Sequence, residues 1–358
     1  DLHSFPTRRS SDLFVTGLLL CLVIAVPAWF LGQHFPIVGG PIFGILFGMV
    51  LCLLIKDKKV IAPGVGFASK KILQGAVVLL GFGLNLRVIA ETGVQSLPII
   101  VSTITISLFV AWILRRAMKM ERDISMLIGV GSSICGGSAV AATAGVIKAD
   151  DEDISKAISV IFFFNVVAAL IFPQLGQLVG FSTESGNAFG IFSGTAVNDT
   201  SSVTAAAATW DAMWNLGSAT LDKAVTVKLT RTLAIIPITL AIAYMRSRSK
   251  TATAAAIDGT AEERNVSVKN MFPMFILYFV LASVITTAAG TLGASEELFA
   301  PLKTLSKFCI VVAMAAVGLN TNIVDLIKSS GKPIVTGLCC WVAITGVSLM
   351  MQKIMGIW

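Results

Sequence analysis

The sequence predicts an all-α polytopic membrane protein with about 11 transmembrane segments, on three observations. Of its 358 residues, 55% are hydrophobic and only 13% are charged, far less charge than an average soluble domain carries. The mean hydropathy is +0.86. The apolar runs reach about 20 residues, the length of a membrane-spanning helix, and do not alternate as the strands of a membrane β-barrel do. These properties exclude a soluble enzyme, a nucleic-acid-binding protein and a disordered chain.

The first thirteen residues differ from the rest of the chain. Residues 3–13 read HSFPTRRSSDL, a polar string that resembles one reading frame of a sequencing-adapter oligonucleotide. It stops at Phe14, where an apolar run begins. We therefore expect residues 1–13 to be a non-native tail and leave them out of the fold. A genuine basic N-terminal tail is the alternative.

Eleven apolar segments follow, and one long polar linker divides them. The linker, residues 246–269, separates eight predicted spans in residues 14–245 from three in residues 270–358. We expect it to be flexible. The segments are residues 14–32, 37–55, 61–85, 98–115, 124–147, 155–180, 186–206, 218–245, 271–291, 300–322 and 332–353.

The charges predict an orientation. Basic clusters follow the even-numbered segments, and the acidic residues gather on the other side. The positive-inside rule then places the N-terminus and the linker in the cytoplasm and the C-terminus outside. The net charge of +7 is thereby explained by loops facing the cytoplasm, with no nucleic-acid partner. The basic residues are Lys56, Lys58, Lys59, Arg115, Arg116, Lys119, Arg122, Arg246, Arg248, Lys250, Lys328 and Lys332.

A short internal repeat predicts inverted symmetry. Gly83-Leu84-Asn85 precedes Pro98, and Gly318-Leu319-Asn320 precedes Pro333 at the same spacing. An odd number of spans separates the two copies, which inverts their topology, as in the repeats of secondary transporters. Both Asn residues end an apolar segment, and helix capping is the interpretation we prefer for them.

Two segments are too rich in small and polar residues to be comfortable transmembrane helices. These are Gly129–Ala144 (GVGSSICGGSAVAATA) and Gly190–Ala206 (GIFSGTAVNDTSSVTAA). Glycine pairs and polar runs favour a break, and a break within the membrane is tolerated only in protein or at a cavity. The N–H groups of the half-helices would then bind a negative ligand. Close packing of small residues is the alternative.

Two cations lie deep in the eighth segment. Lys228 and Arg231 share one helix face and are about 15 Å from either end, too deep to reach water easily. A charge at that depth costs about 3 kcal/mol, which implies a partner. The partner is an anionic substrate, a water-filled cavity or an ion pair with Asp199. In the third segment, Lys70, Lys71 and Gln74 are near enough to an end for snorkelling to be preferred.

These features give a set of candidate residues. We expect the anion to contact both break-prone segments and the two cations, and we assign Asp199 as the protonatable coupling group or the counter-ion of the empty site. The predicted anion-binding residues are Ser132, Ser133, Gly136, Gly137, Ser138, Ser193, Thr195, Asn198, Thr200, Ser201, Lys228 and Arg231.

No cofactor or metal site is predicted. The six cysteines lie in apolar segments without metal-ligand spacing, and the two histidines, His3 and His34, lie outside the spans. No phosphate-binding GxxxxGK[ST] motif is present, so ATP-driven transport by this chain alone is not expected. We do not expect an enzyme, although a membrane-embedded enzyme with Cys135 or a serine as nucleophile is a rival interpretation.

At the same residues the sequence resembles the YeiH-type family of inner-membrane proteins, to which sulfate export is attributed. The matching stretches include Leu79–Leu86 (LLGFGLNL), Ile128–Ala142 (IGVGSSICGGSAVAA) and Ala313–Thr321 (AMAAVGLNT). The resemblance covers nearly all of residues 14–358. It implies a bacterial inner membrane and a fold like that of cation–proton antiporters and bile-acid symporters, with two broken helices. The family pattern has His-Glu at Asn198-Asp199, so only the acidic position carries over.

The sequence thus favours a secondary active transporter of a small inorganic or sulfur-containing anion, working by alternating access. Its partners would be the anion and the bilayer, and a homodimer is compatible with the sequence. A cation–proton antiporter using Asp199 is the rival in the same class, but it gives Lys228 and Arg231 no obvious role. Sequence alone does not separate a carrier from a passive channel.

Overall fold

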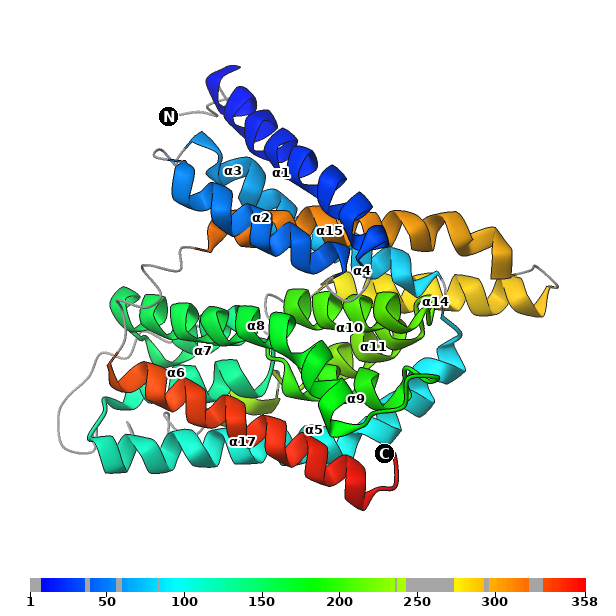
Figure 1. Cartoon of the computed structure of the whole chain (residues 1–358). Coiled ribbons are helices and arrows are strands. Elements are labelled where there is room, and N and C mark those ends of the chain that lie inside the picture. Colours follow the sequence, from blue (N-terminus) through cyan, green and yellow to red (C-terminus); the bar gives the residue numbers. More distant parts are fainter. Residues whose placement is uncertain are drawn as a thin grey trace.

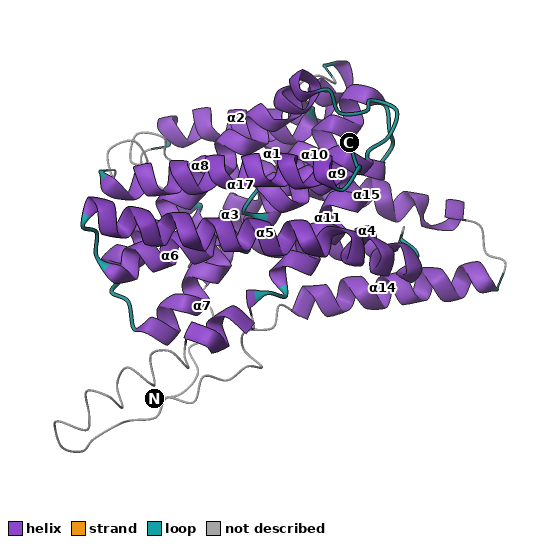
Figure 2. Cartoon of the chain, turned by 90° about the horizontal axis from the view of Figure 1, so that it is seen from below, coloured by secondary structure: helices purple, strands orange, loops and turns teal. Residues whose placement is uncertain are grey.

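The computed structural model describes residues 8–35, 39–55, 60–82, 84–235, 237–242, 274–292, 296–321 and 331–358. Within these ranges the chain forms helices joined by turns and loops, without strands (Figure 2), as the sequence predicts. The elements are α1 (Arg8–His34), α2 (Gly40–Leu54), α3 (Ala62–Phe67), the π-helix η2 (Ala68–Ile72), α4 (Leu73–Gly81), α5 (Leu86–Met118), α6 (Arg122–Ser133), α7 (Gly137–Ile147), α8 (Asp151–Val179), α9 (Asn187–Ala196), α10 (Thr200–Trp214), α11 (Ala219–Thr232), α14 (Met274–Thr291), the 3-10 helix η3 (Glu296–Phe299), α15 (Ala300–Asn320) and α17 (Lys332–Ile354).

In the described chain, 7 helices are long and apolar enough to cross a membrane. The other predicted segments are shorter or divided: α2 has 15 residues, one segment contains η2, and two are broken into α6–α7 and α9–α10. The candidate spans are Leu13–His34, Leu86–Met118, Glu152–Val179, Ala219–Ile242, Met274–Thr291, Ala300–Asn320 and Lys332–Ile354.

Two predicted boundaries differ from the structure. Helix α1 begins at Arg8, within the predicted tail, while residues 1–7 and the linker 246–269 lie outside the described residues. Helix α5 begins at Leu86, so Pro98 lies inside it rather than at its start. The reason is Asn85, whose Oδ1 accepts a hydrogen bond from the Arg87 backbone N–H at 2.9 Å and caps this helix. The capping role expected of Asn85 therefore belongs to the helix that follows it.

The helices form two groups that lie side by side (Figure 1). The first, which we call the α15 group, contains α1 to α4, α14 and α15. The second, the α10 group, contains α5 to α11 and α17. Helices α5 and α17 run next to each other along the outer edge of the α10 group (Figure 1). Both broken helices are in the α10 group.

Glycines hold the α15 group together closely. A Cβ on Gly48 of α2 would stand 2.4 Å from the Ala315 carbonyl oxygen of α15. A Cβ on Gly64 of α3 would stand 2.2 Å from the Phe14 carbonyl oxygen of α1. Membrane helices lack a hydrophobic force that drives them together, so such close approach supplies van der Waals contact in its place. These small residues are packing residues, not ligands.

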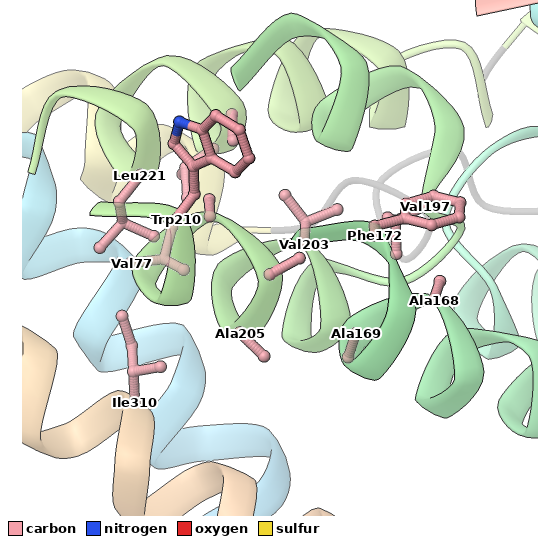
Figure 3. Close-up of a cluster of buried hydrophobic side chains, with 14 of the residues drawn as sticks. Val77, Ala168, Ala169, Phe172, Val197, Val203, Ala205, Trp210, Leu221 and Ile310 are labelled. Atoms are coloured by element: carbon pink, nitrogen blue, oxygen red, sulfur yellow. The ribbon is translucent and has the colours of Figure 1, made fainter. Parts of the chain in front are cut away.

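Helix α10 makes most of the contact between the groups, packing on α2 and α15. Its middle is a run of four alanines, residues 205–208, of which the first three are fully buried. Around it lies the largest apolar cluster, which joins Val77 of α4 and Ile310 of α15 to Trp210 of α10 and Leu221 of α11 (Figure 3). The apolar core thus continues across the boundary between the groups.

Candidate functional site

The first break divides the glycine-rich segment after Ser133. Helix α6 ends there and α7 begins at Gly137. Between them Gly136 has φ +71°, a left-handed conformation that costs an L-amino acid with a side chain about 1–2 kcal/mol. A glycine at this position lets the chain turn without that cost. The break therefore occurs at the Gly136-Gly137 pair, as the sequence indicates.

The second break divides the Asn-Asp segment after Ala196. Helix α9 ends there, and α10 begins at Thr200 with Asp199 as its N-cap residue. The Asp199 Oδ2 atom accepts hydrogen bonds from the Ser201 backbone N–H at 3.0 Å and from the Ser201 hydroxyl. Asp199 thus places a carboxylate on the positive end of α10.

The two breaks meet around Lys228, which is fully buried. Its ammonium group donates to the carbonyl oxygens of Ile134 at 2.7 Å, Val197 at 3.0 Å and Asn198 at 2.5 Å. An ammonium group has three N–H donors, so all of them are used. Lys228 therefore joins the end of α6 to the end of α9.

Arg231, also fully buried, does the same one turn further along α11. Its Nε donates to the Ser133 carbonyl at 2.6 Å and Nη2 to the Ser132 carbonyl at 2.9 Å. Its Nη1 donates to the carbonyls of Thr195 at 2.6 Å and Val197 at 3.3 Å. These carbonyls are the acceptors that the ends of α6 and α9 leave without an intrahelical partner. Two cations at two negative helix ends are a mutually favourable arrangement.

The surroundings of the two cations are thus protein carbonyls rather than an open site. Neither cation forms an ion pair with Asp199. The ion pairs between described residues join other groups. Those pairs are Arg87–Glu91, Lys156–Glu152 and Lys303–Asp222. The sequence predicts an anion, water or Asp199 as the partner of Lys228 and Arg231. The structure instead provides backbone carbonyl groups at the two breaks, which the sequence does not reveal.

A cavity of about 340 Å³ lies on the opposite side of the breaks, at the N-terminal ends of α7 and α10. The α10 group contributes the first residues of both half-helices, and the α15 group contributes η2, α4 and α15. The described residues that line it are Ser69, Lys70, Leu73, Gln74, Val77, Gly137, Ser138, Ala141, Phe162, Asp199, Thr200, Ser201, Phe275 and Val317.

The predicted site residues therefore separate into two sets. Gly137, Ser138, Asp199, Thr200 and Ser201 line the cavity. The others lie in or behind the breaks: Ser132, Ser133, Gly136, Ser193, Thr195, Asn198, Lys228 and Arg231.

Three hydroxyl groups of the second set bind within the protein. The Ser133 hydroxyl donates to the Val130 carbonyl at 2.9 Å, and the Ser193 hydroxyl donates to the Gly190 carbonyl at 3.2 Å. The Thr195 hydroxyl lies 2.7 Å from the Ser348 hydroxyl of α17. Serine and threonine at these positions satisfy backbone acceptors or join helices, and they do not reach the cavity.

Sequence reasoning missed two features of the site, one in the lining of this cavity and one beside the first break. Lys70 and Gln74 line it, although snorkelling was the preferred interpretation of these residues. They lie on or just after η2, and π-helical turns occur frequently at functional sites. Asn165 of α8 also faces the first break, as detailed below. Its signal in the sequence is a single amide within the apolar run of residues 160–172.

A second cavity, of about 370 Å³, lies at the other end of α10 and again between the groups. Its lining includes Asp211 and Asn215 of the α10 group and Gln33 and Lys307 of the α15 group. Beside it, Lys307 donates to the Gly217 carbonyl at 2.8 Å. Polar bonds therefore join the two groups at this end.

The fold and the site define a multi-pass α-helical membrane protein in which two interrupted helices meet beside a cavity. The chain belongs to the YeiH-type family, whose model, described as conserved hypothetical protein 698, matches residues 16–337. It is 56% identical over 344 residues to a UPF0324 membrane protein of Streptococcus mutans, covering 96% of this chain and 98% of the relative. A UPF0324 membrane protein of Fusobacterium nucleatum is 53% identical over 352 residues, with 95% and 98% covered. The resemblance found in the sequence is thereby confirmed.

Proposed function

We propose that this protein is a secondary active transporter of a small inorganic or sulfur-containing anion, with sulfate and sulfite as the first candidates. The observation that supports it is the cavity between the two helix groups, with the N-termini of α7 and α10 and Lys70 in its wall. The anion-binding residues are those of this wall. Lys228 and Arg231 contribute by holding the half-helices in place.

The electrostatics of this wall favour an anion. Each half-helix N-terminus carries roughly half a positive charge together with free N–H donors. Lys70 adds a full positive charge, and among the described lining residues Asp199 is the one that is acidic. These charges sum to about +1, so the wall attracts an anion rather than a cation.

The position of the cavities supports alternating access. Both lie between the α15 group and the α10 group, at opposite ends of α10. An apolar cluster that includes Val77, Ile310 and Leu221 (Figure 3) lies between the two groups. A relative movement of the two groups would close one cavity and open a route through the other. No catalytic step is part of this proposal.

An inverted repeat would give the protein two states of this kind, one with each cavity closed. Helix α15 packs on α4, and α17 packs on α5. Each pair joins an element of one sequence repeat to its counterpart in the other. Crossing of the bacterial inner membrane by about 11 segments, with the N-terminus in the cytoplasm, belongs to the same proposal.

The test is flux through purified protein in proteoliposomes. Sulfate and sulfite uptake are measured with and without a pH gradient, and with Na⁺ replaced by K⁺. Saturable anion flux driven by the gradient supports the proposal. Na⁺-dependent proton movement without anion flux overturns it in favour of a cation–proton antiporter that uses Asp199, and non-saturable flux indicates a channel.

Lys70→Gln tests the position of the anion. Removing one partly solvated charge at the cavity wall should raise the KM for the transported anion about fivefold, with a smaller effect at high salt. The matched control is Lys71→Gln, because both lysines are exposed but only Lys70 is in the described cavity lining. Equal effects of the two changes would contradict an anion site at this wall.

A further inference from the structure

Asn165 is a buried amide without a partner. It lies on α8, is 2% exposed, and neither its Oδ1 nor its Nδ2 forms a hydrogen bond in the described structure. A buried polar group left unpaired is costly, and an apolar residue of the same shape avoids that cost. An amide kept at this position therefore indicates a partner in another state of the protein.

The Asn165 amide and the Asp199 side chain flank one small space. A Cβ on Gly136 would stand 3.6 Å from Asn165 Nδ2 and 3.4 Å from Asp199 Cβ. Gly136 has no Cβ, so this space separates the amide from the base of the carboxylate side chain. Rotation of Asp199 about χ1 moves its carboxylate between staggered positions around that base.

In the present state the Asp199 carboxylate is itself the anion at the N-terminus of α10. It accepts hydrogen bonds from both the backbone N–H and the hydroxyl of Ser201. An anion from solution that takes these donors must displace the carboxylate. Two negative groups in one partly buried position would repel each other strongly.

We propose that Asp199 and the transported anion exchange places, and that Asn165 Nδ2 receives the displaced carboxylate. The inference rests on the proposed function and identifies Asn165 as a positioning residue that acts through Asp199. The empty site is closed by the protein's own carboxylate. When the anion is bound, the Asp199 carboxylate accepts a hydrogen bond from Asn165 Nδ2, which has no acceptor in the empty state.

The variant that tests this is Asn165→Leu, which keeps the side-chain size and removes both polar atoms. In the empty protein it should leave the unfolding temperature unchanged or raise it, because the amide has no partner there. Sulfate affinity should fall about tenfold, because the displaced carboxylate loses a charged hydrogen bond. The measurements are thermal unfolding without sulfate and equilibrium binding of radiolabelled sulfate in nanodiscs.

The control is the same change combined with Asp199→Asn. Asparagine caps a helix as well as aspartate does but carries no charge to be relocated. Asp199→Asn alone should tighten sulfate binding, and adding Asn165→Leu should then change the affinity less than about twofold, within the additivity expected of unlinked sites. If Asn165→Leu weakens binding equally in both backgrounds, Asn165 does not act through Asp199 and the inference is overturned.

The proposed function is judged separately. A wild-type protein that binds and moves no small inorganic or sulfur-containing anion, sulfate and sulfite included, refutes the anion transporter, and this inference with it. A wild-type protein that binds and transports one of them, without coupling between Asn165 and Asp199, refutes only the exchange. A loss of stability in Asn165→Leu without sulfate would also refute it, because the amide would then have a partner in the empty state.

Discussion

Lys228→Met removes the ammonium group that joins the two breaks and keeps most of the side-chain volume. The variant loses three hydrogen bonds to the carbonyls of Ile134, Val197 and Asn198. Val197 keeps the bond from Arg231 at 3.3 Å, so two carbonyls lose a charged donor outright. We therefore expect the assembly of half-helices to be destabilised.

The cost follows from those two carbonyls. A hydrogen bond to a charged donor is worth about 2 kcal/mol, so the variant should lose about 4 kcal/mol of unfolding free energy. For a chain of 358 residues, with an unfolding entropy of about 2.1 cal/mol/K per residue, this corresponds to a fall in Tm of roughly 5 °C. The assay is thermal unfolding of the purified protein in detergent or nanodiscs, followed by intrinsic fluorescence.

Lys223→Met is the matched control, on the same helix. The half-buried Lys223 donates to a single side-chain acceptor, Gln95 Oε1, at 3.0 Å, so its loss should cost about 1 kcal/mol. The reasoning is refuted if Lys228→Met unfolds within about 2 °C of the wild type, given the conversion above. A stable variant that has lost sulfate binding would instead make Lys228 a ligand of the anion.

Two further predictions concern glycines. Gly136→Ala should destabilise the protein by about 1–2 kcal/mol, because φ is +71° there, whereas Gly137→Ala, which has no neighbour within 4 Å, should be close to neutral in the same unfolding assay. Gly48→Ala should separate α2 from α15 and lower the unfolding temperature by several degrees, because its Cβ would stand 2.4 Å from a carbonyl oxygen. Gly75→Ala, with nothing within 4 Å, should be neutral or stabilising, and equal effects of Gly48→Ala and Gly75→Ala would contradict the packing argument.

The sequence predicts those features that local chemistry determines. The all-helical class follows from the composition and the length of the apolar runs. Both breaks occur where the sequence indicates, at Gly136 and at Asn198-Asp199, because a left-handed glycine and a capping aspartate act within a few residues. The polar Asn-Asp run is costly in a membrane, and the end of one helix beside the start of the next resolves that cost.

The features that the sequence misses depend on residues far apart in the chain. Lys228 and Arg231 stand out as buried cations, but their acceptors are carbonyls about 30 and 95 residues away, freed only when two helices end side by side. The π-helical turn at Lys70 has no counterpart in the residue pattern. The partnerless state of Asn165 likewise emerges only once α8 is packed against the breaks.

The four alanines at the middle of α10 have a consequence for the kinetics of any movement between the groups. Larger side chains interdigitate, and one helix can pass another only if they change rotamer. Consecutive residues point in different directions around a helix, so only part of this run faces α2 and α15. Alanine has no side-chain rotamers to rearrange, so that part of the contact resists sliding only weakly. If the α15 group moves along α10, the polar bonds that cross between the groups, among them those of Lys303, Lys307 and Thr287, must break, and they then limit the speed of the step.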